Sequence, residues 1–277
     1  MYKRQGLWST NELDVARLVD SDIRNYQPQQ LAIEVNRRYL RSFGSNTWQQ
    51  FRLFCTTLPN TPWDLDQKVV FANTEVTKED HATKKLPYAL APGDISAYDE
   101  LVSVLYTPEE RAKFEWAIGA IISGESKDIH KALVFFGKPG EGKSTIMDIF
   151  EDLFDGYTMT FEVADVVSAN NQFAVAQFKD NSLVAIDQDG DLSKVVDNTK
   201  LNKLISHDKL VINEKHKTQY EIRPSAMLVI GTNKPVRITD AKSGLIRRIL
   251  DIRPTGNLHT SRTVSYTHLT LPTILLV

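Results

Sequence analysis

The stretch from Gly137 to Ser144 constrains the fold of this chain more than any other segment. It reads Gly-Lys-Pro-Gly-Glu-Gly-Lys-Ser and matches the pattern G-x-x-x-x-G-K-[ST] at every fixed position. The apolar run Ala132–Phe136 precedes it and is typical of a buried strand, and apolar residues with helical spacing follow it as far as Gly156. A strand, a glycine-rich loop and a helix in this order predict a loop that holds phosphate groups.

Such a loop binds nucleotide phosphates through its backbone N–H groups, so every residue along it is a candidate contact. The expected nucleotide-binding residues are Gly137, Lys138, Pro139, Gly140, Glu141, Gly142, Lys143, Ser144 and Thr145. The Lys143 ammonium is expected to reach the β- and γ-phosphates, and the Ser144 hydroxyl is expected to hold Mg²⁺. A glycine-rich turn that binds nothing is the competing interpretation, and the flanking strand and helix argue against it.

A second apolar segment ends in acidic side chains. Leu183–Asp187 reads as a buried strand, and Asp187 at its tip is the expected Mg²⁺ ligand beside Ser144. In a phosphate-loop fold a second carboxylate at this point orients the attacking water, and Asp189 is the candidate. An apolar strand followed by Asp is common, so this prediction depends on the phosphate loop that precedes it.

Two later segments also end in polar groups. Ala226–Gly231 reads as another buried strand, and Asn233 beyond it could hydrogen-bond the water or the γ-phosphate. Turn formation by Asn-x-Pro is the alternative explanation. Arg247 and Arg248 follow a polar loop, and a guanidinium there could reach a phosphate held by a neighbouring subunit. The alternative is a solvated pair of charges flanking an edge strand.

A β-hairpin is predicted over residues 210–222, where two β-prone arms flank a charged tip. The tip carries Lys215, His216 and Lys217 in a row. It lies in a basic region, since residues 200–262 contain 13 Lys and Arg against 5 Asp and Glu. Such a local basic surface is where a nucleic-acid backbone could bind, and an exposed, solvated turn is the alternative.

Strand and helix patterns alternate after residue 101, which predicts an α/β domain with a central, mostly parallel sheet. Thr107, Pro108 and Glu110 predict a helix start with a capping box. Helices are also expected over 173–178 and 194–205. The preceding region, 6–100, is predicted to be smaller and mainly helical. Its aromatic residues Trp48, Phe51, Phe54 and Trp63 are expected in a core, with base stacking as the alternative.

Composition excludes several classes of protein. The chain is 42% hydrophobic and 25% charged, which is ordinary for a soluble globular protein. A formal net charge of -2 argues against a wholly basic nucleic-acid binder, and the single cysteine, Cys55, excludes an internal disulfide framework. The sequence has no apolar run of membrane-spanning length and no signal-peptide pattern. We therefore expect a cytoplasmic protein without a membrane partner.

The ordered set of motifs resembles superfamily 3 helicases of the AAA+ class, and most of all the phage, plasmid and poxvirus primase-helicase type. The order is phosphate loop, acidic strand, Lys-His hairpin, Thr-Asn-x-Pro strand end and Arg-Arg. The resemblance implies an AAA+ P-loop NTPase fold and a homo-hexameric ring that hydrolyses ATP between subunits, with ATP and Mg²⁺ as cofactors. Single-stranded or forked DNA is the implied partner, with a primase domain or protein as a further one.

By the same resemblance, each motif residue takes a role in the motor. Lys143 and Ser144 bind phosphate and Mg²⁺, and Asp187 is the acidic strand residue. Asn233 is the polar sensor, and Arg248 is the finger that reaches the next subunit. Lys215, His216 and Lys217 form the hairpin that contacts DNA. The family usually has two adjacent acidic residues at the strand end, whereas Gln188 separates them here. Either Asp189 orients the water from a shifted loop, or hydrolysis is impaired, so the departure leaves the water-orienting residue open.

Both ends of the chain resemble translated sequencing-adaptor sequence, at Met1–Gln5 and Val264–Thr273. The expected organisation is adaptor residues at 1–5 and 263–277, a helical region with a linker at 6–100, and a C-terminally truncated superfamily 3 ATPase domain at 101–262. A genuine β-prone strand at the C-terminus is the alternative interpretation of that end.

The leading hypothesis is an ATP-dependent DNA helicase of a phage or plasmid, which would act in the host cytoplasm if a phage encodes it. The alternative is an AAA+ initiator or loader that binds DNA with ATP but does not unwind it. A small-molecule kinase would need a lid and an acceptor site, and the sequence shows neither. Stimulation of ATP hydrolysis by single-stranded DNA would separate these classes.

Overall fold

The computed structural model describes Asp14, Arg17 and residues 69–77, 80, 82–168, 171, 173–180, 182–193, 197–213, 219–236 and 244–257. The chain divides into two compact units, and the smaller one ends at Lys85. In that unit β1 (Val69–Val70) and β2 (Lys84–Lys85) pair in parallel. The predicted helices and aromatic cluster of the N-terminal region, and both adaptor-like ends, lie outside the described residues.

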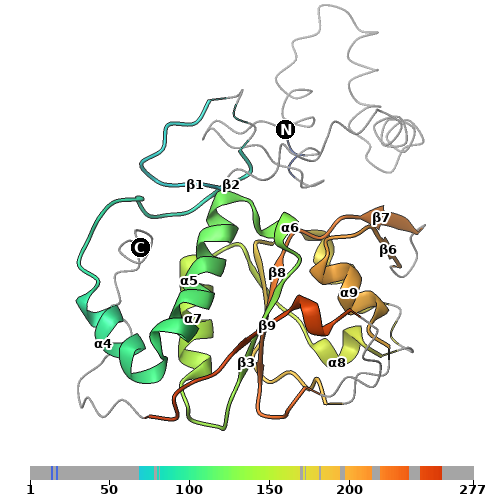
Figure 1. Ribbon diagram of the computed structural model, residues 1–277. Coiled ribbons are helices and arrows are strands. Elements are labelled where there is room, and N and C mark those ends of the chain that lie inside the picture. The colour runs from blue at the N-terminus through green and yellow to red at the C-terminus, as the bar shows by residue number, and fades with distance from the viewer. Residues whose placement is uncertain are drawn as a thin grey trace, which may run out of the picture. The chain divides into compact units, whose positions relative to one another are not determined.

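The larger unit is built on a five-stranded parallel sheet with the order β4-β5-β8-β3-β9 (Figure 1). The strands are β3 (Ala132–Phe136), β4 (Thr158–Thr160), β5 (Val184–Asp187), β8 (Met227–Thr232) and β9 (Ile249–Ile252). The predicted fold class, α/β with a central and mostly parallel sheet, is confirmed. Each predicted strand is present, with ends that differ by a residue or so.

Helices cover both faces of the sheet in Figure 1, with α5 and α7 on one side and α8 and α9 on the other. The helices are α4 (Ser96–Leu105), α5 (Pro108–Ser123), α6 (Ser126–Ile129), α7 (Lys143–Leu153), α8 (Val163–Val166) and α9 (Thr199–Ile205), with 3-10 helices η3 (Ala176–Asp180) and η4 (Ile246–Arg248). Strands covered on both faces must be apolar throughout, which explains the continuous apolar runs in the sequence.

Two predicted helices differ from the observed ones. The segment predicted at 173–178 forms turns followed by η3. Of the helix predicted over 194–205, residues 197 and 198 are not helical and the described helix is Thr199–Ile205. The Asp197 carboxylate accepts a hydrogen bond from the Thr199 backbone N–H at 2.8 Å. A carboxylate that satisfies an N–H at a helix start competes with continuation of the helix in the N-terminal direction.

The start of α5 follows the predicted pattern in part. Thr107 caps the helix, since its Oγ1 accepts from the Glu110 backbone N–H at 3.3 Å, and Pro108 occupies the first turn. In a full capping box the Glu110 carboxylate would also accept from the Thr107 backbone N–H, and here it has other partners. The Glu110 carboxylate accepts instead from Lys113 Nζ at 2.7 Å and from the Arg253 backbone N–H at 3.0 Å. Glu110 thereby links the helix start to the segment that follows β9.

The side chains of β3 alternate between two cores, one on each face of the sheet. Leu133 and Phe135 of β3 are fully buried, and Phe135 packs against Phe114 of α5 with ring centroids 6.2 Å apart. Ala132 and Val134 face the other core, with residues of β4, α8, α9 and the hairpin strands. Because side chains alternate along a strand, one five-residue segment connects two cores.

The predicted hairpin is present, since β6 (Leu210–Ile212) pairs antiparallel with β7 (Tyr220–Ile222). Leu210 and Ile212 are buried, whereas Val211 between them is exposed. The hairpin therefore packs one face onto α9 and its neighbours. Its tip, with Lys215, His216 and Lys217, lies outside the described residues.

Candidate nucleotide-binding site

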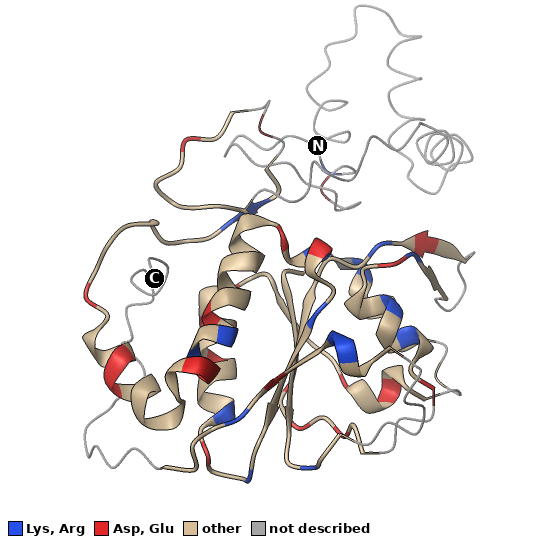
Figure 2. Ribbon diagram, viewed as in Figure 1, with Lys and Arg blue, Asp and Glu red and all other residues tan. Residues whose placement is uncertain are grey.

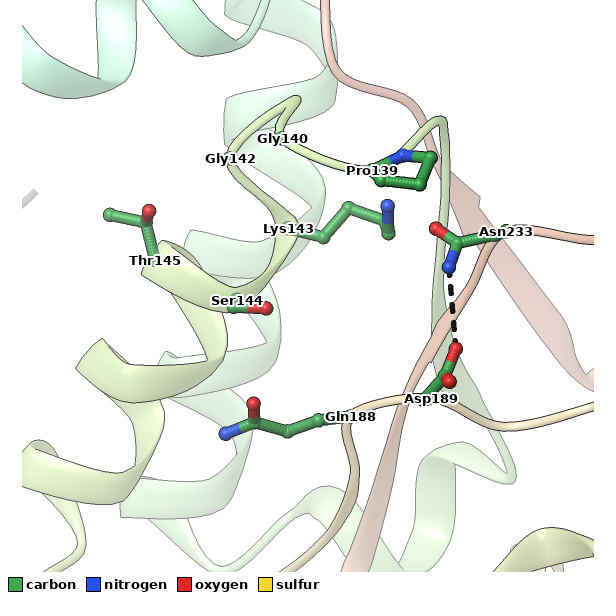
Figure 3. A pocket seen from close by; sticks show the side chains of 9 residues that line it. All are labelled: Pro139, Gly140, Gly142, Lys143, Ser144, Thr145, Gln188, Asp189 and Asn233. Atoms are coloured by element: carbon green, nitrogen blue, oxygen red, sulfur yellow. Dashed lines mark hydrogen bonds between the residues drawn. The ribbon is translucent and has the colours of Figure 1, made fainter.

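The site lies where three neighbouring strands end. The phosphate loop follows β3, the Gln188–Asp189 segment follows β5, and Asn233 follows β8. Because these strands are parallel and adjacent, their carboxyl ends meet at one edge of the sheet, where α/β proteins usually bind ligands. There a pocket of about 450 Å³ is lined by Pro139, Gly140, Gly142, Lys143, Ser144, Thr145, Gln188, Asp189 and Asn233 (Figure 3).

The phosphate loop owes its shape to its glycines. Gly140 and Gly142 have φ angles of 82° and 88°, which side chains with a Cβ rarely adopt. A Cβ on Gly142 would also lie 2.8 Å from a methyl carbon of Leu105, at the end of α4. The Tyr106 hydroxyl donates to the Gly142 carbonyl at 3.4 Å. The end of α4 therefore supports the loop from behind, and α7 begins directly after it.

Lys143 is the central cation of the pocket. Its Nζ donates to the carbonyls of Gly137 and Lys138, each at 2.8 Å, and the residue is buried. Burial lowers the pKa of its ammonium, although the carboxylates of Glu141 and Asp189 act in the opposite direction. A buried ammonium with only carbonyl partners is well suited to an incoming anion, because phosphate oxygens would offset its desolvation.

Side-chain contacts join the loops after β5 and β8. Asn233 Nδ2 donates to Asp189 Oδ1 at 3.3 Å inside the pocket (Figure 3). Just beyond it, Lys234 Nζ lies 2.6 Å from Asp191 Oδ2, and this contact holds the pKa of Asp191 well below its ordinary value. These pairs fix the predicted sensor amide against the predicted water-orienting carboxylate.

Asp187 lies behind the pocket. It is buried, and its two carboxylate oxygens accept backbone N–H groups, from Val163 at 2.7 Å and from Asp189 at 3.2 Å. Burial raises its pKa, while those two hydrogen bonds oppose the rise. Asp187 is absent from the pocket lining, whereas Asp189 is part of it. In this arrangement Asp187 connects the start of α8 to the loop that carries Asp189.

Gln188 occupies the pocket between the phosphate-loop helix and Asp189. Its Nε2 donates to Asp148 Oδ1 at 3.3 Å and to Glu151 Oε1 at 3.4 Å, both on α7. Since carboxylates only accept, these partners assign the NH₂ group to the α7 side. In Figure 3 the amide oxygen of Gln188 points toward Ser144. A neutral acceptor thus faces the predicted Mg²⁺ position.

Sequence reasoning missed Gly231, which sets how closely these loops approach. A Cβ there would lie 2.6 Å from Met147 Cε and 2.7 Å from the Gln188 carbonyl oxygen. The Gly190 backbone N–H also donates to the Gly231 carbonyl at 2.7 Å. Only glycine lets the loop after β5 lie directly over β8. A glycine inside an apolar strand pattern is the signal that could have indicated this close approach.

Arg248 lies at the amino-terminal ends of the strands, whereas the pocket lies at their carboxyl ends. It directly precedes β9, whose first residue pairs with Ala132 at the start of β3, whereas the phosphate loop follows the end of β3. The five residues of β3 place the two about 15 Å apart along the strand direction. Arg248 Nε donates to Ser206 Oγ at 2.8 Å and Nη1 to the Gly244 carbonyl at 3.0 Å. Arg248 therefore does not take part in the pocket of its own chain.

The lining of the pocket fits the phosphates of a nucleotide. Free backbone N–H groups at the start of α7, the Lys143 ammonium and the Ser144 hydroxyl converge on one concave surface. Mg²⁺ is commonly held by one or two protein oxygens together with substrate phosphates, and Ser144 and Asp189 supply such oxygens at the pocket. Asp187, the predicted Mg²⁺ ligand, accepts hydrogen bonds from two backbone N–H groups and is not among the residues that line the pocket.

A family of unknown function, DUF5906, matches residues 135–248 of this chain. The matched range begins in β3, includes every residue of the pocket and ends at Arg248. It covers less than half of the chain. A comparison with curated proteins finds no match.

Solved structures of the NrS-1 C-terminal region are similar to this chain at low identity. One matches with a TM-score of 0.47 and 20% identity, over 68% of this chain and 44% of the other. A second matches with a TM-score of 0.44 and 20% identity, over 60% of this chain and 38% of the other. This chain thus spans less than half the length of either. Among the described residues, no helix combines the length and apolar character that a membrane crossing needs.

Proposed function

We propose that this chain is the motor domain of an ATP-dependent DNA helicase of the phage or plasmid primase-helicase type. It would work as a homo-hexameric ring in the host cytoplasm and move along single-stranded DNA. The observation that carries the proposal is the pocket in which the phosphate loop faces the Asp189–Asn233 pair.

Each residue of the pocket has a part in ATP hydrolysis that follows from its position. Lys143 binds the β- and γ-phosphates, and Ser144 holds Mg²⁺, which when bound neutralises charge on those phosphates. Asp189 accepts a hydrogen bond from the attacking water and orients it. Asn233 fixes the Asp189 carboxylate through its amide N–H, which leaves its carbonyl oxygen for the same water. Asp187 keeps this loop in place through its two backbone contacts.

Arg248 supports a ring. Because it lies at the edge of the sheet opposite to its own pocket, a role in phosphate chemistry requires a pocket on another copy of the chain. In a head-to-tail arrangement the Arg248 side of each subunit faces the pocket side of its neighbour. Such an arrangement closes into a ring when the rotation between subunits permits. A guanidinium supplied in this way stabilises the charge that develops on the transferred phosphoryl group.

The test is ATP hydrolysis by the full chain, with and without single-stranded oligo(dT). We expect hydrolysis that increases with the DNA, and we expect Lys143→Ala to reduce it to background because the phosphate-binding charge is lost. Glu75→Ala, in the smaller unit, serves as a matched surface control and should hydrolyse ATP as the parent does. Hydrolysis that responds only to duplex DNA would indicate a loader. Equal turnover in the Lys143→Ala variant would overturn the assignment of the pocket.

A further inference from the structure

One buried segment joins the hairpin to Arg248. Ser206 and His207 follow α9 and lead, through two residues, into β6. Both residues are buried although both are polar. Neither side chain lies near the nucleotide pocket, and no step of the proposed hydrolysis uses them. Buried polar groups normally bind a specific partner, and these two have partners on different elements.

Ser206 holds the guanidinium of Arg248. Its Oγ accepts from Arg248 Nε at 2.8 Å, while Arg248 Nη1 donates to the Gly244 carbonyl at 3.0 Å. The guanidinium lies so close to Gly244 that a Cβ there would be 2.7 Å from Nη1. Because the guanidinium is planar, hydrogen bonds to two of its nitrogens fix the orientation of the whole group. Ser206 and Gly244 thereby decide where the remaining Nη2 group points.

His207 closes the base of the hairpin. Its Nδ1 lies 2.9 Å from the carbonyl oxygen of Pro224, and since a carbonyl only accepts, Nδ1 carries the proton. His207 precedes β6, and Pro224 follows β7, so this contact joins the two segments that enter and leave the hairpin. The backbone of His207 has a φ of 52°, which turns the chain sharply out of α9. A tilt of the hairpin would therefore move His207 and, through the chain, Ser206.

We propose that Ser206 is a positioning residue that transmits the position of the β6–β7 hairpin to the Arg248 guanidinium. The inference rests on the proposed function, in which the hairpin contacts DNA and Arg248 acts on the nucleotide of a neighbouring subunit. Figure 2 shows basic residues along α9 and at η4, the two elements that Ser206 joins. DNA at the hairpin would thus alter the orientation of Arg248 without any contact between DNA and nucleotide.

Kinetics of the full chain test the positioning role. Ser206→Ala removes the acceptor for Arg248 Nε and should lower the DNA-stimulated turnover about tenfold, as expected for a lost hydrogen bond to a charged group. The affinity for ATP should stay at the parent value, because the pocket lies at the other edge of the sheet. Ser206→Thr keeps the hydroxyl and should restore most of the turnover. Equal losses in both variants would indicate a packing defect and overturn the role.

A double variant separates positioning from a general effect on the fold. If Ser206 acts through Arg248, Ser206→Ala should cause no further loss of turnover in a chain that already carries Arg248→Ala. Losses that multiply would show that Ser206 acts independently and would overturn the inference.

The Arg248 Nε–H resonance gives a readout that does not depend on hydrolysis. It should exchange slowly with water in the parent and rapidly in Ser206→Ala, and addition of single-stranded oligo(dT) should shift it in the parent. DNA binding that leaves this resonance unchanged would overturn the coupling and spare the proposed function. A chain that binds no DNA would overturn the proposed function, and the coupling with it.

Discussion

Gln188 separates the two acidic residues Asp187 and Asp189 at the end of β5. Its amide N–H groups face the carboxylates of Asp148 and Glu151 on α7, at 3.3 Å and 3.4 Å. Burial raises the pKa of Asp148, and the contact with Gln188 opposes that rise. A carboxylate at position 188 would lose both of these hydrogen bonds and would be repelled by the two carboxylates, because it has no N–H group to donate.

We predict that Gln188→Glu alone does not raise ATP turnover. Repulsion from Asp148 and Glu151 should turn the new carboxylate away, with a loss of less than about 1 kcal/mol in the free energy of unfolding because positions 148 and 188 are exposed. Adding Asp148→Asn supplies a donor that can hold the carboxylate toward the pocket, and turnover should then rise. Turnover and thermal melting of the single and double variants give the answer. An equal rise in both would show that α7 does not control position 188.

At the scale of elements, the approach of the β5 loop to β8 depends on Gly231. A methyl group there would lie 2.7 Å from the Gln188 carbonyl oxygen. Because this oxygen belongs to the backbone, the whole loop after β5 would have to shift to relieve the contact. We predict that Gly231→Ala costs about 1–3 kcal/mol of unfolding free energy and lowers turnover more than ATP affinity, because Gln188 and Asp189 shift while the phosphate loop stays.

Gly119→Ala is the matched control for that substitution. Gly119 lies inside α5, and a Cβ there has nothing within 4 Å. It should gain about 0.5–1 kcal/mol, since alanine replaces glycine in a helix. Chemical denaturation and ATP titration of both variants provide the comparison. Unchanged turnover in Gly231→Ala would mean that the loop position does not govern hydrolysis.

The burial of His207 at the base of the hairpin makes the fold sensitive to acid. Burial lowers the pKa of His207, and the charge of His130 acts in the same direction, while Asp128 and the carbonyls of Pro224 and Ser126 oppose them. The unfolded chain therefore takes up the proton first as the pH falls. The stability that His207 contributes is fully present above its unfolded-state pKa of about 6.5 and is lost as the pH falls from there through its folded-state pKa, by at most about 1.4 kcal/mol per pH unit.

We predict that His207→Asn flattens this dependence. Asparagine accepts the φ of 52° and places an N–H donor near the former Nδ1 position. His130→Asn makes the same exchange at an exposed residue with the same φ of 52°, and it should flatten the dependence less, because it removes only the charge that His130 adds. Unfolding free energies between pH 8 and pH 5 are to be compared for the three chains. A parent and a His207→Asn variant with parallel profiles would exclude His207 as the acid-sensitive group.

At the scale of the whole molecule, the position of Arg248 predicts shared sites. Arg248→Ala should bind ATP as the parent does but hydrolyse it poorly, since its pocket is intact and the guanidinium is missing from the neighbour. Mixed with Lys143→Ala chains in equal amounts, it should regain activity at about one quarter of the interfaces, where both intact halves meet. The measurement is turnover of the mixture against that of each variant alone. Mixed assemblies without any recovery would contradict action between subunits.

Much of the fold follows from contiguous sequence. The strand Ala132–Phe136, the glycines of the phosphate loop and the helix after it are each specified by neighbours along the chain, because alternation, positive φ angles and helix starts are local properties. The ends of helices were harder, as at Thr199, where the Asp197 carboxylate competes with the helix for a backbone N–H. Gln188, Asp189 and Asn233 could be placed at one edge because parallel strands end together.

The sequence by itself therefore determined the phosphate loop, the parallel sheet and the edge at which the site lies. Only the tertiary structure decided what each polar group contacts. It turned the Asp187 carboxylate toward two backbone N–H groups, set Gln188 against α7, and placed Arg248 at the far edge with Ser206. The physical reason is that a side chain's partners depend on strand order and on how closely loops from distant segments approach, as Gly231 illustrates, and neither is encoded in local spacing.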